Sequence, residues 1–284
     1  MNPSDADTDA ATDRDREGGD ASPSGEYDRT PSFYTSDDTF ERYLGQTSHY
    51  LALQDALVEL VGYIDPDGIL EPGSGLGQTA IRLADEYPAT DVHGIDNRES
   101  VVERSRTAAE DPSVRPNLTF STAEMRAYVE SADSLPDLVA FLHSFHHIPD
   151  PLSEKIDFLE ACHAALPDGG HICIGETFLR ADPRNGAADR AVRTQWADRA
   201  LESYASTFWS SLDGVTPDDI ERARSVGVFS QDHESAAGEN VRNRDEEYLV
   251  TMDWLVENAR SVGFEVVLAE PVNSLGDGVV LLRR

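Results

Sequence analysis

The stretch that decides the fold runs Ile69-Leu70-Glu71-Pro72-Gly73-Ser74-Gly75-Leu76-Gly77-Gln78-Thr79-Ala80. It has the pattern of a short apolar strand, a glycine-rich turn and the start of a helix. Glycine has no Cβ, so a ligand can approach the turn closely, and the free N–H groups at the start of a helix attract an anion. Glu71, two residues before the first glycine, places a carboxylate where it can face a cationic group. The stretch therefore predicts a ligand site at the end of a strand.

A second acidic residue, Asp96, follows the next predicted strand. Its carboxylate oxygens can accept hydrogen bonds from both hydroxyls of a ribose. A ligand with a carboxylate and an ammonium group suits the glycine turn and Glu71 better than a pyrophosphate does, and the methionyl end of S-adenosylmethionine is such a ligand. A glycine turn alone is also typical of a purely structural bend. Its combination with Glu71 and Asp96 favours a nucleoside cofactor.

Outward from this stretch, short apolar runs alternate with helical patterns. The predicted strands after the first are 91–95, 117–121, 137–142 and 170–176, and the predicted helices are 75–86, 98–109, 125–134 and 151–166. Such alternation predicts an α/β fold with a parallel sheet, right-handed crossovers and helices on both faces. A helical entry segment with apolar positions such as Tyr50 precedes it. A last helix over 247–262 stops at Gly263, and two strands follow at 264–269 and 278–283.

Two segments depart from the alternation. Residues 1–30 are rich in Asp, Ser, Gly and Thr, so we expect a disordered acidic tail. Residues 31–284 then form one domain. Within it, residues 179–247 are polar and punctuated by aromatic residues, with a helical pattern over 188–212 and a helix start at Thr216, and they predict an inserted helical cap.

The charge restricts the partners. The formal net charge is −31, which repels phosphate backbones and anionic membrane surfaces and disfavours nucleic acid as a substrate. No apolar run of about 18 residues predicts a membrane span. Lys155 is the sole lysine, and this pattern resembles proteins of extreme halophiles, since molar salt shortens the Debye length to roughly 3 Å and screens self-repulsion. The same screening weakens the argument against nucleic acid, and an ordinary acidic protein is the alternative.

The cysteines indicate the compartment. Cys162 and Cys173 fall in a predicted helix and a predicted buried strand, which favours packed, reduced thiols over a redox pair. The first residues carry neither a basic nor an apolar segment typical of a secretion signal. We therefore expect a soluble cytoplasmic protein.

Taken together, these residues resemble class I S-adenosylmethionine-dependent methyltransferases over most of residues 64–179. The glycine motif of that family corresponds to residues 71–77 and its ribose acid to Asp96. The resemblance implies a Rossmann-like parallel sheet whose final antiparallel strand lies beside the fifth, S-adenosylmethionine as cofactor, and methyl transfer to a small-molecule acceptor. The cofactor-binding residues implied are Glu71, Gly73, Ser74, Gly75, Gly77, Asp96, Asn97 and Ala123, with Asn97 beside the adenine.

The later motifs support the same family, with one departure. The segment after the fourth strand, Ser144-Phe145-His146-His147-Ile148-Pro149-Asp150, looks most like small-molecule methyltransferases related to quinone-biosynthesis enzymes. After the third strand, relatives often carry Asp before Ala to contact the adenine, whereas this chain has Thr122 before Ala123. That contact is therefore left unassigned.

His143 and Glu176 are the candidate catalytic residues. Both follow strands at their carboxyl ends, where open α/β sheets place ligands. His143 can serve as a cofactor contact or general base, or be a structural histidine at the sheet edge. Glu176 can orient substrate or take a proton, or instead cap a helix or pair with an arginine. Methyl transfer needs a base only when the nucleophile begins protonated.

Other chemistries remain as alternatives. His143, His146, His147 and Asp150 have spacing suited to zinc, but adjacent residues on a regular element point apart, so no metal site is predicted. A nicotinamide-dependent oxidoreductase could use the same turn and Asp96, although the G-x-G-x-x-G spacing is missing. A non-catalytic cofactor-binding protein is the third hypothesis.

Overall fold

The computed structural model describes residues 48–109, 113–148, 152–181, 195, 249–274 and 276–284. All of them lie in one compact unit, Glu41–Arg284. The predicted tail over 1–30, the predicted helix over 188–212 and the helix start at Thr216 lie outside the described residues. The same holds for most of the predicted cap over 179–247.

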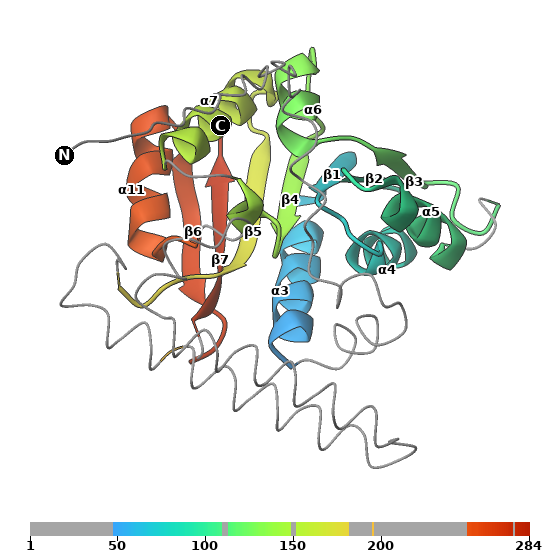
Figure 1. Cartoon of the computed structure of the whole chain (residues 1–284), viewed down its shortest axis with the longest axis horizontal. Helices are drawn as coiled ribbons and strands as arrows, with labels where there is room; N and C mark the ends of the chain where they lie inside the picture. The colour runs from blue at the N-terminus through green and yellow to red at the C-terminus, as the bar shows by residue number, and fades with distance from the viewer. Residues whose placement is uncertain (1–47, 110–112, 149–151, 182–194, 196–248, 275) are drawn as a thin grey trace, which may run out of the picture. The chain divides into compact units, whose positions relative to one another are not determined.

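The centre of the unit is a seven-stranded sheet with the order β3-β2-β1-β4-β5-β7-β6 (Figure 1). Strands β1 to β5 pair in parallel, and β7 pairs antiparallel with both β5 and β6. This confirms the predicted Rossmann-like sheet with an antiparallel final strand beside the fifth. The strands are β1 Gly68–Pro72, β2 Asp91–Asp96, β3 Leu118–Thr122, β4 Leu138–Leu142, β5 His171–Thr177, β6 Glu265–Pro271 and β7 Asp277–Arg283.

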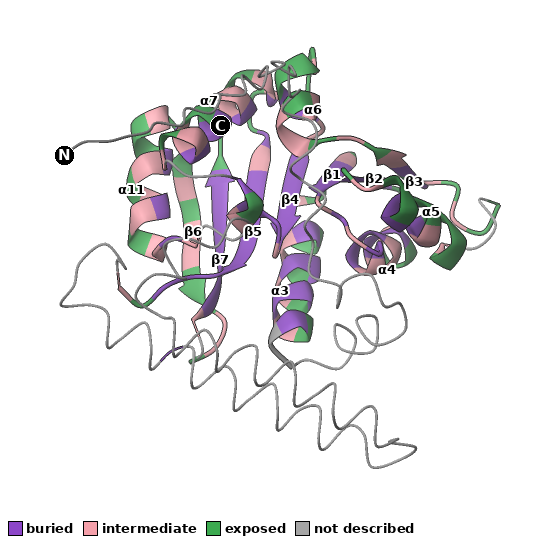
Figure 2. Ribbon diagram, viewed as in Figure 1, coloured by how far each residue is buried: buried purple, intermediate pink, exposed green. Residues whose placement is uncertain are grey.

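Helices cover both faces of the sheet, because successive strand residues point to opposite sides. In β1, Ile69 packs into an apolar cluster with α3, α4 and α5, whereas Leu70 packs into a cluster with α6, α7 and α11. The helices are α3 Ser48–Ile64, α4 Gln78–Glu86, α5 Glu99–Ala108, α6 Met125–Ser131, the 3₁₀ turn η2 Phe145–His147, α7 Ser153–Ala165 and α11 Met252–Val262. Figure 2 shows the central strands β4, β5 and β7 buried along most of their length.

Local chemistry explains where the helices depart from the predicted bounds. Helix α4 begins at Gln78, later than predicted, because Gly75 and Gly77 have left-handed φ values of 54° and 77°. Helix α11 begins at Met252 because the Thr251 side chain caps it by accepting a hydrogen bond from Trp254 N. It ends at Gly263, as predicted, with a φ of 117°.

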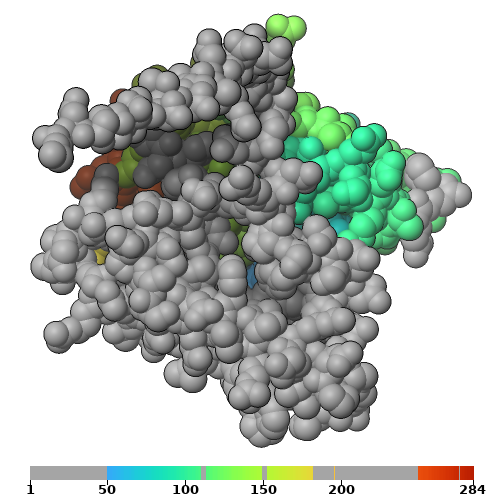
Figure 3. Space-filling model, viewed as in Figure 1, coloured from blue at the N-terminus to red at the C-terminus, as the bar shows by residue number. Residues whose placement is uncertain are grey.

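The remaining features of the described chain agree with the composition. Cys162 and Cys173 are both buried and free, as expected for packed thiols. Glu99 and Glu103 on α5 are exposed. Figure 3 shows the blue-green part of the surface, to which α5 belongs, at the right. None of the helices formed by the described residues combines the length and the apolar character needed to cross a bilayer.

Candidate functional site

The three glycines of the turn after β1 have different surroundings, although all have positive φ values. A Cβ on Gly73 would lie 2.6 Å from Ser144 Cβ, and a Cβ on Gly77 would lie 2.6 Å from Phe120 Cζ. A Cβ on Gly75 would meet no heavy atom within 4 Å. Gly73 and Gly77 are therefore required by packing inside the protein, whereas Gly75 borders open space that a ligand can enter.

Glu71 is a buried carboxyl group at the end of β1, with 3% of its surface exposed. Burial raises its pKa to about 8, against the opposing effect of hydrogen bonds from Ala80 N–H and the Thr79 side chain. Its Oε2 atom has no hydrogen-bond partner among the described residues. A buried oxygen without a partner is costly, so this position suits a cationic or hydrogen-bond-donating ligand.

Asp96 is the last residue of β2, and its carboxylate hydrogen-bonds the glycine turn that follows β1. Its Oδ2 accepts a hydrogen bond from Gly75 N at 3.2 Å, and its Oδ1 accepts one from Arg98 N at 3.0 Å. Oδ1 also accepts from Arg98 Nε at 3.5 Å, at the long limit of a hydrogen bond, whereas Oδ2 accepts from Gly75 alone among the described residues and has a lone pair left for a hydroxyl. Asp96 therefore holds the turn in place and retains the capacity to bind a ligand hydroxyl.

The other predicted cofactor residues lie at the same edge. Ser74 is buried, and its Oγ has no hydrogen-bond partner among the described residues. Asn97 is exposed directly after β2, and Ala123 N donates to Asp96 O at 2.9 Å. Thr122, exposed at the end of β3, stands opposite Asp96 in the strand register. The structure thus brings all eight predicted residues to the carboxyl ends of β1, β2 and β3.

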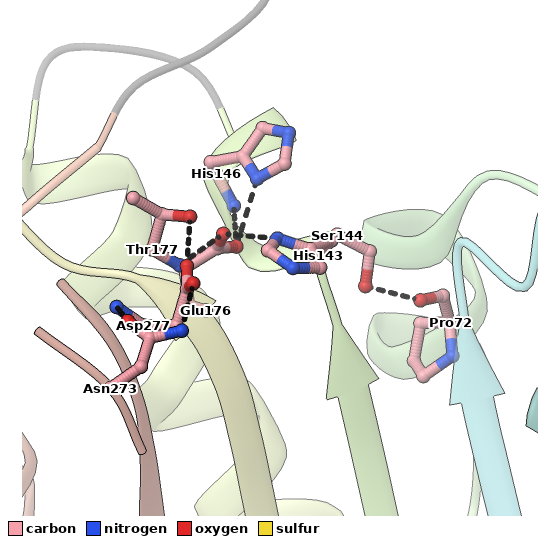
Figure 4. A network of polar contacts seen from close by, with 8 residues as sticks. All are labelled: Pro72, His143, Ser144, His146, Glu176, Thr177, Asn273 and Asp277. Atoms are coloured by element: carbon pink, nitrogen blue, oxygen red, sulfur yellow. Dashed lines mark hydrogen bonds and ion pairs between the residues drawn. The ribbon is translucent and has the colours of Figure 1, made fainter. Parts of the chain in front are cut away.

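The second half of the site is a carboxylate between two histidines, shown in Figure 4. Glu176 Oε1 lies 3.3 Å from His143 Nδ1, and Glu176 Oε2 lies 2.8 Å from His146 Nδ1. Each oxygen also accepts a hydrogen bond from a backbone N–H group. Thr177 N donates to Oε1 at 2.9 Å, and His146 N donates to Oε2 at 3.2 Å. Among the described residues, the partners of Glu176 are therefore histidines and backbone amides and not the helix terminus or arginine that the sequence left open.

The electrostatics keep Glu176 ionised. Burial acts to raise its pKa, but the neighbouring charges of His146 and His143 and the hydrogen bonds from both rings outweigh it and hold the pKa well below the ordinary value. His143 itself has an unusual backbone for a residue other than glycine, with a φ of 51°, and its N–H donates to Gly175 O at 2.9 Å. A buried anion with two ordered imidazoles is an arrangement that can orient a proton acceptor.

One member of this cluster, His146, was not predicted in this role. It was interpreted from the sequence as part of a family motif and was weighed as a metal ligand, not as a partner of Glu176. The expectation that His146 and His147 point apart is wrong, since their ring centroids are 4.2 Å apart. They lie on the single short turn η2, where the two long side chains can fold toward each other. Asp150 lies outside the described residues. The described residues contain no group of three side chains placed to hold a metal ion.

Lys155, the sole lysine, is fully buried on α7. Its ammonium donates to Phe145 O at 3.1 Å and also to Ile148 O, and lies 5.2 Å from the centroid of the Phe145 ring. These two carbonyls flank the histidine pair, so Lys155 stabilises the turn that carries His146. The sequence could have indicated this role, because the one lysine of the chain lies in the helix that follows this turn.

The two halves of the site are joined by hydrogen bonds and packing. Ser144 Oγ donates to Pro72 O at 2.6 Å, which connects the turn after β4 to the end of β1. On the other side, Thr177 Oγ1 donates to the buried Asp277 carboxylate at 2.8 Å, which also accepts from Asn273 Nδ2 at 2.7 Å. Figure 4 shows these contacts as two groups along the same edge of the sheet: Ser144 with Pro72, and the histidines and Glu176 with Thr177 and Asp277.

Comparison with known proteins agrees with this geometry. Residues 69–170 match the family model described as a methyltransferase domain. An O-methyltransferase family protein from Burkholderia thailandensis superposes with a TM-score of 0.55 at 12% identity, covering 89% of this chain and 62% of that one. The mitomycin 7-O-methyltransferase MmcR superposes with a TM-score of 0.53 at 13% identity, and the match covers 89% of this chain and 60% of that one. The S-adenosylmethionine-dependent methyltransferase SibL superposes with a TM-score of 0.50 at 16% identity, and the match covers 81% of this chain and 54% of that one.

The chain thus has a Rossmann-like α/β fold, and its predicted site residues lie along the carboxyl edge of the sheet. Residues 69–170 of this fold match the model of a methyltransferase domain. The solved structures share the fold at low identity, and the chain spans between 54% and 62% of their length.

Proposed function

We propose that this chain is an enzyme that binds S-adenosylmethionine and transfers its methyl group to a small-molecule acceptor. The observation that carries the proposal is the buried Glu71 Oε2, which has no partner among the described residues, in the same strand–turn unit as the open space at Gly75 and with Asp96 on the neighbouring strand. Glu71 suits the ammonium group of such a cofactor, and Asp96 suits the ribose hydroxyls. When bound, the cofactor supplies a methyl group already activated on a sulfonium.

The remaining cofactor contacts in the proposal come from the same edge. Gly73, Ser74, Gly75 and Gly77 shape the turn around the methionyl group, while Asn97 and Ala123 flank the adenine. The residues present fit the cofactor because the turn provides space at Gly75 and Ser74 provides a second buried polar atom without a protein partner in the described chain.

The acceptor side uses His143, His146 and Glu176. Glu176 can accept a hydrogen bond from the protonated Nδ1 of each ring, which leaves Nε2 as the proton acceptor. The two imidazoles are comparably accessible, with 20% of the His143 side chain and 12% of the His146 side chain exposed. We therefore assign the base to this histidine pair, with Glu176 holding the orientation of both rings. Because a base is required only when the acceptor begins protonated, this cluster favours an acceptor atom that carries a proton to be removed.

The insertion is proposed as a cap over the acceptor side of a domain spanning residues 31–284, after a disordered tail over 1–30. Its one described residue between 182 and 248, Gln195, is fully buried. Gln195 Nε2 donates to Phe178 O at 2.6 Å, and its Oε1 accepts from Arg180 N at 2.8 Å. Gln195 therefore lies against the chain that leaves β5, at the second and fourth residues after Glu176, which supports a role of the insertion in acceptor selection.

We test the cofactor by calorimetric titration with S-adenosylhomocysteine and, separately, with NADH. The expected result is binding of S-adenosylhomocysteine alone. Asp96→Ala removes the carboxylate that hydrogen-bonds the ribose and lowers the affinity about 100-fold, roughly 3 kcal/mol. Asp91→Ala, an exposed carboxylate at the other end of β2, is the matched control and retains wild-type affinity. Binding of NADH, or of neither ligand, contradicts the proposal.

The composition supports a cytoplasmic protein adapted to molar salt that does not act on nucleic acid. The two buried free thiols fit a reducing compartment, and the 54 acidic residues against 23 basic ones fit a medium that screens repulsion. Chemical unfolding should show a free energy of unfolding that rises steadily between 0.1 M and about 2 M KCl, where screening is nearly complete. A flat dependence contradicts the adaptation.

A further inference from the structure

Tyr50, in the first turn of α3, contacts both halves of the site. Its ring stacks on the His143 imidazole, with centroids 5.8 Å apart and planes inclined by 18°. Its hydroxyl lies 3.0 Å from Thr79 Oγ1. The sequence predicted Tyr50 only as an apolar position of a helix, yet the side chain is buried between the residue that follows β4 and the start of α4.

The Tyr50 hydroxyl is connected to Glu71 through Thr79. Thr79 is fully buried, its Oγ1 also accepts from Gln54 Nε2 at 3.1 Å, and its side chain hydrogen-bonds the Glu71 carboxylate. A threonine hydroxyl has one proton and two lone pairs. When a bound ammonium keeps Glu71 ionised, its carboxylate can only accept; because Gln54 donates, Thr79 then gives its proton to Glu71 and accepts from Tyr50.

The state of Tyr50 agrees with a donor role. Burial, followed by the charge of Glu71, raises the pKa of its phenol above the ordinary value, so the hydroxyl keeps its proton at neutral pH. Removal of that proton donor would leave Thr79 with a lone pair unused and would weaken the order around Glu71.

The Tyr50 ring is connected to Glu176 through His143. The imidazole of His143 lies between the Tyr50 ring and the Glu176 carboxylate, at 5.8 Å between centroids and 3.3 Å between Nδ1 and Oε1. Offset stacking of this kind restricts the plane of a ring. The stack adds to the Glu176 contact in fixing the ring of His143, whose backbone has a left-handed φ of 51°.

We propose that Tyr50 is a positioning residue with two separable roles: its hydroxyl orders Glu71 through Thr79 for the cofactor ammonium, and its ring holds His143 against Glu176. The proposal rests on the proposed function for the first role only. Tyr50 thereby connects the cofactor half of the site to the acceptor half without touching the reacting atoms.

The test separates the two roles with Tyr50→Phe, which removes the hydroxyl and keeps the ring, and Tyr50→Leu, which removes both. Tyr63→Phe and Tyr63→Leu are matched controls, because Tyr63 lies on the same helix and is 80% exposed. Calorimetry with S-adenosylhomocysteine measures the first role. NMR of imidazole protons in histidine-labelled protein, with the His143 signal assigned through His143→Gln, measures the second.

We expect Tyr50→Phe to weaken S-adenosylhomocysteine binding by about 3- to 10-fold, in line with the loss of one buried hydrogen bond, and to leave the His143 signal near its wild-type position. Tyr50→Leu should weaken binding at least as much and should also shift the His143 signal, since the ring current of the stacked phenol is lost. Both Tyr63 variants should match wild type.

Wild-type affinity in Tyr50→Phe overturns the hydroxyl role, and an unshifted His143 signal in Tyr50→Leu overturns the ring role. If the wild-type protein itself fails to bind S-adenosylhomocysteine, the proposed function and the hydroxyl role both fail, while the NMR comparison still decides the ring role. A Tyr50→Leu protein that does not fold is replaced by Tyr50→Met, which keeps the volume of the side chain and removes the ring.

Discussion

The two halves of the carboxyl edge of the sheet differ in how their polar atoms are used. On the cofactor half, formed by the ends of β1, β2 and β3, Glu71 Oε2 and Ser74 Oγ lack partners in the described chain and Gly75 borders open space. On the histidine half, formed by the ends of β4 and β5, both oxygens of Glu176 accept two hydrogen bonds. This difference agrees with the proposal that the first half receives a ligand and that the second half, already ordered by protein groups, positions a proton acceptor.

The contrast has a physical reason. A cofactor with charges and hydroxyls of its own can satisfy buried protein atoms when it binds, so the protein can leave them unpaired at a cost that binding repays. A residue that moves a proton must be oriented before the acceptor arrives, and only protein groups can do that. Substitutions on the histidine half should therefore change stability, and substitutions on the cofactor half should change ligand affinity.

The largest effect is expected from Glu176→Gln. An amide cannot accept from both histidines and both backbone N–H groups, so the loss resembles the breaking of a buried pair and should lower the free energy of unfolding by about 3–5 kcal/mol at pH 7. Because the pKa of Glu176 is held below its ordinary value of 4.5, the wild type keeps this stabilisation above that value and loses it as the pH falls through the lowered folded value. The difference between wild type and variant should therefore shrink below pH 4.5.

Urea unfolding from pH 7 to pH 3 measures this prediction. Glu160→Gln, an exposed glutamate on α7, is the control and should change the free energy of unfolding by less than about 0.5 kcal/mol. Equal effects of the two variants would show that the histidine half is not ordered by Glu176.

A smaller effect should distinguish the glycines of the turn. Gly73→Ala combines left-handed strain with a 2.6 Å contact to Ser144 Cβ and should lower the free energy of unfolding by about 2–3 kcal/mol. Gly75→Ala carries the strain alone, about 1–2 kcal/mol, but places a methyl group in the space at the turn. Thermal unfolding and S-adenosylhomocysteine titration should rank the two variants in opposite orders. The same order in both measurements would contradict the assignment of Gly75 to the ligand.

The smallest effect is expected in the pH dependence of ligand affinity at the cofactor half. Burial raises the pKa of Glu71 to about 8, so below that pH the ligand ammonium must displace a proton. The affinity for S-adenosylhomocysteine should rise about tenfold from pH 6 to pH 7, equivalent to about 1.4 kcal/mol, and level off above pH 8. Glu71→Gln should bind weakly and without this slope.

The same shift predicts the behaviour of the free protein. With a folded pKa above the unfolded value of 4.5, the native state holds the extra proton, so the Glu71 contribution to stability falls as the pH rises from 4.5 to 8. Glu71→Gln removes that decline. Identical pH profiles of unfolding for wild type and variant would place the carboxyl group in a more polar environment than the structure shows.

The sequence alone determined the sheet and the cofactor half, because both depend on local patterns. Apolar runs alternating with helical periods predicted the parallel strands, and the positive φ values in the turn can be read from Gly73, Gly75 and Gly77 themselves. Glu71 and Asp96 follow their strands directly, so their place at the edge comes with the strand.

Only the tertiary structure decided the histidine half. His146 and Glu176 belong to different strand ends, and they meet because β4 pairs with β5. The stack of Tyr50 on His143 and the bonds from Lys155 to the histidine turn depend on how α3 and α7 pack against the sheet. Strand order and helix packing are set by the burial of the whole core, so no local pattern in the sequence states which distant side chains will converge.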